Sequence, residues 1–201
     1  MKHVIEEDHI FIETLVSEIQ DNLLNEKRYQ FPEFPLKEGW SAIVWDEWHT
    51  TIEESEESDE GNDIISPIHF ELLADIIFER CGAKQCWLID TEPFVDSDGG
   101  FLKRNFTKVD LTWKSFNLYH RLFDFAPFRF YLVDESLTWF IYVDESVLVA
   151  GDPQFMNLLV KKMGGYQTLL THLNSYASED ANTRTKRWVS NIIKRFKEQN
   201  A

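Results

Sequence analysis

Carboxylates are the side chains of this chain best suited to acid/base chemistry or to cation binding, and four of them occur in two copies of one short motif. Val133-Asp134-Glu135-Ser136 is repeated as Val143-Asp144-Glu145-Ser146. The residues between the copies predict a strand of about six or seven residues, which at roughly 3.4 Å per residue would hold the two motifs about 20 Å apart, at opposite ends of a sheet. Carboxylates that far apart do not form one site. We therefore predict that both motifs are solvated turns, in which Asp and Ser are common.

Asp96-Ser97-Asp98-Gly99 is a second candidate, because alternate carboxylates ahead of a glycine can wrap a calcium ion. Alignment with a calcium loop puts Phe94 at its first ligand position and Asn105 at its last, where a bidentate Glu is needed. Both ends lack the ligand, so a polar turn is the better interpretation. The six histidines are scattered, and none has the spacing of a zinc site. The sequence predicts no metal site and no cofactor.

Residues 45–49, Trp-Asp-Glu-Trp-His, place two carboxylates and a histidine beside aromatic rings. Acid/base catalysis requires a partly desolvated pair of such groups, and no second segment of the sequence completes one, so we predict packing or a partner contact. The chain has neither a phosphate-binding glycine loop nor a serine nucleophile motif. Cys86 lies in an apolar strand, without the positive surroundings that activate a thiol. We predict a protein that is not an enzyme and has no catalytic residues.

Charge is distributed unevenly along the chain. The net charge is −15; residues 1–100 contain 25 Asp/Glu and 6 Lys/Arg, whereas residues 101–201 contain 10 and 14. An acidic surface repels nucleic acid and anionic membranes and favours a basic protein partner. Six cations on the last predicted helix are interpreted as a face that is solvated or paired with the acidic half. They are Arg184, Lys186, Arg187, Lys194, Arg195 and Lys197.

The most acidic stretch is 53–63, EESEESDEGND, with seven carboxylates and no apolar side chain. It predicts an acidic mobile loop at about 53–64. With the aromatic cluster before it, this loop predicts a docking surface on which charge speeds association and aromatic rings hold the complex. A disordered insertion without a role is the alternative. The predicted partner-binding residues are Trp45, Asp46, Glu47, Trp48, Glu53, Glu54, Glu56, Glu57, Asp59 and Glu60.

The surrounding elements must position these segments, and 201 residues suffice for a single domain with a sizeable core. Apolar spacing and capping residues predict helices over 6–27, 66–80, 112–123, 153–163, 166–176 and 185–198. The core-facing stripe predicted for the second helix is Ile68, Leu72, Leu73, Ile76 and Ile77, and that for the third is Trp113, Phe116, Leu118 and Leu122. A strand is predicted over 85–90. Residues 41–53 could form a strand or a short helix, because periodicity does not decide between them.

The densest β-forming stretch is 128–150. Phe128, Phe130 and Leu132 alternate with Arg129, Tyr131 and Val133, which predicts a strand with one better-buried face. Residues 139–143 are apolar throughout, which predicts a strand covered on both faces. With 147–150 these segments predict a three-stranded meander. The predicted fold class is α+β, with a small antiparallel sheet (meander about 128–150) surrounded by helices.

The first residues, MKHVIEEDH, lack the layout of a secretory signal, and no apolar run is long enough to span a membrane. In such a chain we expect the two cysteines, Cys81 and Cys86, to be reduced and buried rather than bridged. These features predict a cytoplasmic protein.

A compact, acidic, aromatic-rich chain without catalytic motifs resembles the small cytoplasmic immunity proteins of bacterial toxin systems, both polymorphic and contact-dependent. The resemblance is one of general character and includes the strand-turn FIYVDESVLVAGDP at 140–153. It implies stoichiometric binding that blocks a cognate toxin, such as one with a basic nuclease site. The alternatives are a regulatory or scaffold module that binds a basic host or phage protein, and an enzyme without a recognisable motif. The oligomeric state is not predicted.

Overall fold

A six-stranded antiparallel sheet is the centre of the fold. The computed structural model describes residues 6–23, 36–45, 67–91, 94–95, 102–122, 129–143, 147–178 and 183–199. The strand order is β1-β8-β7-β6-β2-β5, and a short β3–β4 pair stands apart from it. The strands are β1 (Ser41–Trp45), β2 (Gln85–Asp90), β3 (Phe94–Val95), β4 (Leu102–Lys103), β5 (Phe106–Asp110), β6 (Phe130–Val133), β7 (Trp139–Val143) and β8 (Val147–Gly151). Helices surround this sheet, which confirms the predicted α+β class.

The helices agree with the predicted segments to within a few residues over the described ranges. α1 continues as a π-helical turn, η1, and 41–45 forms a strand rather than a helix. The helices are α1 (Glu6–Glu18), η1 (Ile19–Leu23), α2 (Pro67–Cys81), α3 (Trp113–Leu122), α4 (Pro153–Lys162), α5 (Tyr166–Ser178) and α6 (Thr183–Gln199).

The predicted meander is confirmed as β6, β7 and β8, which pair in sequence with Val133 opposite Phe140 and Phe140 opposite Ala150. Four of the five residues of β7 are buried, as expected of a strand covered on both faces. The prediction of one better-buried face for β6 was wrong, because all four of its residues are buried. A central strand whose two sheet faces both carry helices has no solvent side.

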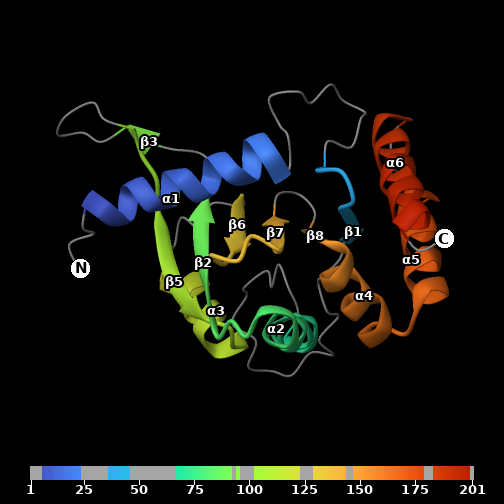
Figure 1. Cartoon of the computed structure of the whole chain (residues 1–201), viewed down its shortest axis with the longest axis horizontal. Coiled ribbons are helices and arrows are strands. Elements are labelled where there is room, and N and C mark those ends of the chain that lie inside the picture. Colours follow the sequence, from blue (N-terminus) through green and yellow to red (C-terminus); the bar gives the residue numbers. More distant parts are fainter. Residues whose placement is uncertain are drawn as a thin grey trace.

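Helices cover opposite faces of the sheet. The ring of Phe11 on α1 lies 5.9 Å from that of Trp87 on β2. Asp90 lies three residues after Trp87 in β2, so its side chain is on the other face of the sheet. It is opposite Phe130 of β6 in the strand register. The ring of Phe116 on α3 lies 6.1 Å from that of Phe130. Accordingly, α1 runs along one side of the strands and α2 and α3 lie on the other (Figure 1).

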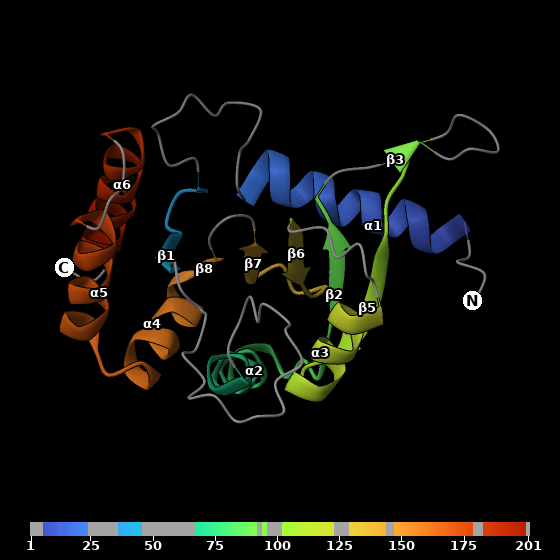
Figure 2. The same cartoon turned by 180° about the vertical axis from the view of Figure 1, so that it is seen from behind.

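The last helices extend the fold beyond β1 (Figure 2). α6 packs against this edge strand, where the side-chain amide of Gln199 donates to the carbonyl of Gly39 at 3.2 Å. Arg195 of α6 donates to the carbonyl of Leu36 at 2.8 Å. Lys194 of this helix lies 3.9 Å from Glu198, also on α6. Pairing of this cationic face with the acidic half stays a prediction, because the densest carboxylates, at 53–63, lie outside the described residues.

Three predictions about individual side chains were wrong. Ile68 is 75% exposed and Leu118 is 57% exposed, although both were assigned to core-facing stripes. In α2 the buried Phe70, two positions after Ile68, takes the core site. In α3 Phe116, a member of the predicted stripe, is buried as expected. Asp134, predicted to be solvated, is buried, because Cys81 and Ser136 hydrogen-bond its carboxylate.

Both cysteines are free; Cys86 is buried and Cys81 is partly buried. Several sequence predictions lie outside the described residues. They are the remainder of the partner-binding cluster and the acidic loop (46–66), the calcium-like turn (96–101) and the second acidic corner (144–146).

Candidate protein-binding surface

Of the ten predicted partner-binding residues, the structure describes only Trp45, through its backbone. It is the last residue of β1 and pairs with Val147 of β8. The other nine lie between 46 and 60, outside the described residues. The chain is described again from Pro67, which is the first residue of α2. The acidic segment of the sequence therefore joins the sheet at β1 and leads into α2.

The side of α2 that faces away from the sheet continues this acidic character. We call it the α2 outer face and define it by five exposed residues: Ile68, Glu71, Asp75, Phe78 and Glu79. Their spacing of three, four, three and one positions places them on one side of a helix. Ile68 is 75% exposed and Phe78 is 53% exposed. Glu71 and Asp75 thus lie between the two exposed apolar side chains, and Glu79 follows Phe78. Oε1 of Glu71 also accepts from the backbone N–H of Trp113, the first residue of α3, at 2.7 Å.

The opposite side of α2 fixes the direction of this face. Its buried residues are Phe70, Leu73, Ala74, Ile76 and Ile77. The ring of Phe70 stacks on that of Phe116 in α3 with centroids 4.7 Å apart. These five buried apolar side chains lie within about two turns, and their burial leaves the outer side of α2 available to solvent or to a partner.

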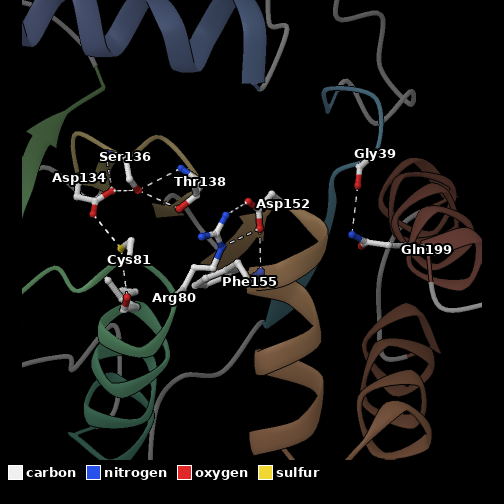
Figure 3. Close-up of polar contacts among 10 residues, drawn as sticks. Gly39, Arg80, Cys81, Asp134, Ser136, Thr138, Asp152, Phe155 and Gln199 are labelled. Atoms are coloured by element: carbon white, nitrogen blue, oxygen red, sulfur yellow. Dashed lines mark hydrogen bonds and ion pairs between the residues drawn. The ribbon is translucent and has the colours of Figure 1, made fainter.

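An ion pair holds the C-terminal end of α2 against α4. Nη2 of Arg80 lies 2.5 Å from Oδ2 of Asp152, and this hydrogen bond raises the pKa of Arg80. Asp152 is also the N-cap of α4, since its Oδ1 accepts from the backbone N–H of Phe155 at 2.8 Å. One carboxylate therefore both starts α4 and ties α2 to it (Figure 3).

A second polar cluster joins α2 to the first acidic corner. Sγ of Cys81 lies 3.1 Å from Oδ2 of Asp134. The other carboxylate oxygen accepts from the backbone N–H and the hydroxyl of Ser136, at 3.1 and 2.5 Å. Asp134 is 3% exposed, because these donors satisfy it away from water. Figure 3 shows Cys81 at the end of α2 directed at Asp134. The hydrogen bond to Asp134 thus holds the C-terminal end of α2, the helix that carries the α2 outer face.

Neither thiol has the chemistry of a nucleophile. Burial raises the pKa of the Cys81 thiol, and the adjacent carboxylate of Asp134 adds to the effect. Burial likewise raises the pKa of Cys86. A raised pKa reduces the fraction of thiolate, which is the reactive form.

We therefore expect both cysteines of the native protein to react with iodoacetamide at pH 8 at least about tenfold more slowly than free cysteine. In denaturant both should react at the rate of free cysteine. Peptide mapping by mass spectrometry distinguishes the two positions. Rapid native alkylation of Cys81 would contradict the assignment of this cluster to a structural role.

The remaining corner residue, Glu135, takes part in a surface cluster on the α1 side of the sheet. It accepts from Nε1 of Trp87 at 3.0 Å and from Lys108 at 2.9 Å. Burial opposes ionisation, but the donors Lys108 and Trp87 outweigh it and hold the pKa of Glu135 below its ordinary value. The Lys108 ammonium also lies 4.9 Å above the Trp87 ring. This cluster neutralises its own charges and offers little to a partner.

Sequence reasoning missed the α2 outer face because it assigned Ile68 to the core. The signal that could have revealed it is the line of Glu71, Asp75 and Glu79 at intervals of four, which marks a solvent side of a helix.

Among the described residues, no group of three or more His, Cys, Asp or Glu side chains is placed to hold a metal ion. In the same part of the chain, every helix is too short or too polar to cross a membrane. A scan of protein-family models finds no match to the chain, and searches of curated proteins and of solved structures find no significant similarity.

Proposed function

We propose that this chain is an acidic cytoplasmic protein that binds a basic protein partner, and that it is an immunity protein which neutralises a cognate toxin by stoichiometric binding. The observation that carries the proposal is the concentration of negative charge in residues 1–100, 25 Asp/Glu against 6 Lys/Arg. Its densest part, 53–63, leads into a helix whose outer face is itself acidic. Such a surface attracts a partner of opposite charge.

In this mechanism the carboxylates accelerate encounter with the partner, and apolar side chains provide the contact that slows dissociation. No bond is made or broken. A toxin with a basic nuclease site would be blocked because the bound acidic surface occupies the positions of its nucleic-acid phosphates.

Affinity capture from the native host at low and moderate salt, followed by mass spectrometry, tests the proposal. We expect one basic protein in stoichiometric amount, retained less well at the higher salt, whose expression alone arrests growth and whose co-expression with this chain does not. Recovery of no protein at either salt would contradict binding. Recovery of a basic protein that is harmless when expressed alone would contradict the immunity role.

Neutralising the acidic segment should slow association without unfolding the chain. The substitutions are Glu53→Gln, Glu54→Gln, Glu56→Gln, Glu57→Gln, Asp59→Asn and Glu60→Gln. Removing six charges from the attracting surface should lower the association rate constant by about tenfold or more at low ionic strength and flatten its dependence on salt. Stopped-flow measurement with the captured protein gives both quantities. An association rate that changes with salt as it does for the unaltered chain would reject this segment as a docking element.

A further inference from the structure

We infer that the α2 outer face is the surface on which a cationic, amphipathic segment of the basic partner docks. This inference rests on the proposed function and names the contact that it requires. Ile68 and Phe78 are ten residues apart, which along a helix is about 15 Å. An apolar anchor at each end and carboxylates between them match a segment of about three helical turns that carries Lys or Arg between its own apolar residues.

The described surface exposes few large apolar side chains, so two on one helix face are informative. They are Ile10, Phe11, Ile68, Phe78 and Leu118. Ile10 and Phe11 belong to α1 on the other side of the sheet, and Leu118 belongs to α3. Among the residues whose side chains the structure describes, only on α2 do exposed apolar residues flank two carboxylates four positions apart, Glu71 and Asp75. Exposed apolar side chains within a charged rim are typical of interaction surfaces.

Cations of the chain itself already contact the edges of this face. Nζ of Lys84 lies 5.9 Å from the centroid of the Phe78 ring, and Nζ of Lys162 lies 3.0 Å from Oε2 of Glu79. The centre is different: among the described residues, no cation pairs with Asp75. A Lys or Arg of the partner would pair with Asp75 in the way that Lys162 pairs with Glu79.

The anchoring of α2 makes this face rigid. Arg80 and Cys81, which follow Glu79 directly, are held by Asp152 and Asp134. A preformed surface loses little conformational entropy on binding, so its contacts contribute more fully to affinity.

The test compares two double variants that change the net charge equally. Asp75→Lys with Ile68→Ser alters the α2 outer face. Asp8→Lys with Ile10→Ser makes the same changes on α1, across the sheet, where Ile10 is 67% exposed. Ile68, Asp75 and Ile10 are exposed and Asp8 is partly buried, and circular dichroism with thermal melting verifies that both variants fold. The probe is a fluorescently labelled synthetic peptide of Leu and Lys in helical amphipathic spacing, and anisotropy at low salt gives its affinity.

We expect the α2 variant to bind the peptide at least about tenfold more weakly than the unaltered chain, and the α1 variant to stay within about threefold of it. Equal losses in both variants would show that only total charge matters and would overturn the inference. Failure of the unaltered chain to bind the peptide would overturn it too.

Capture from the host, repeated with both variants, separates this inference from the proposed function. A basic protein retained by the unaltered chain and the α1 variant but lost by the α2 variant supports both. Retention by all three overturns the docking surface and leaves the proposed function standing. Capture of nothing by the unaltered chain contradicts the proposed function itself. Self-association abolished by the α2 variant would assign the face to a second copy of the chain and overturn the inference.

Discussion

Replacing Trp139 with alanine is expected to lower the free energy of unfolding by about 3–5 kcal/mol, a large fraction of the roughly 5–15 kcal/mol by which ordinary domains are stable. Trp139 begins β7 in the middle of the sheet and is fully buried. Its ring stacks on that of Phe155 in α4, with centroids 6.2 Å apart. Truncation would leave a large cavity between the sheet and α4. Urea denaturation followed by circular dichroism measures the loss.

Trp139→Phe is the matched control. The indole Nε1 of Trp139 is buried and, in the described part of the chain, has no hydrogen-bond partner. Phenylalanine removes this unpaired donor, which costs roughly 1–3 kcal/mol when buried, and retains stacking on Phe155. The control should therefore lose much less stability than the alanine variant. If Trp139→Ala unfolds at the same urea concentration as the unaltered chain, the central strand is not where the structure places it.

The second large effect is expected at Arg104, a charged residue that is 6% exposed. Its guanidinium donates to the carbonyl of Asp90 at 2.6 Å and also to that of Thr91. Nε lies 3.1 Å from Oε1 of Glu13, so the side chain connects α1 to the end of β2. Arg104→Met should cost about 2–3 kcal/mol, because it leaves buried carbonyl oxygens without a donor.

Glu13→Gln distinguishes the carbonyl contacts from the ion pair. The Glu13 side chain is 51% exposed, and exposed ion pairs contribute roughly 1 kcal/mol at most. We expect this variant to lose far less stability than Arg104→Met in the same denaturation experiment. Equal losses would mean that the ion pair, rather than the carbonyl contacts, carries the contribution of Arg104.

Local patterns predicted most of the elements, because they determine each element independently of the others. The apolar runs at 130–133, 139–143 and 147–150 and the polar residues between them suffice to predict a meander. The cap at Asp152 and Pro153 likewise marks the start of α4. What local pattern does not contain is the pairing of β1 with β8 and of β2 with both β5 and β6. These pairings join segments far apart in the chain and depend on tertiary packing.

Which polar groups are buried could not be predicted from local sequence either. Asp134 has the composition of an exposed turn, yet Cys81, 53 positions earlier, lies against its carboxylate. The same holds for the α2 outer face: a helical stripe drawn through Ile68 is as regular as the observed one through Phe70. Only the location of the neighbouring Phe116 decides between them. The acidic segment, by contrast, could be predicted as a candidate from composition alone.

The measurement that tests the central claim most directly is a calorimetric titration of the captured basic protein with this chain at two salt concentrations. We expect one-to-one stoichiometry at both, and an affinity at least about tenfold weaker when the ionic strength rises from about 0.05 to 0.3 M, because salt screens the carboxylates that attract the partner. An affinity that does not change with salt would contradict this claim. Heat that is still released well beyond the one-to-one point of the titration would also contradict it, because an enzyme that turns over a substrate behaves in this way.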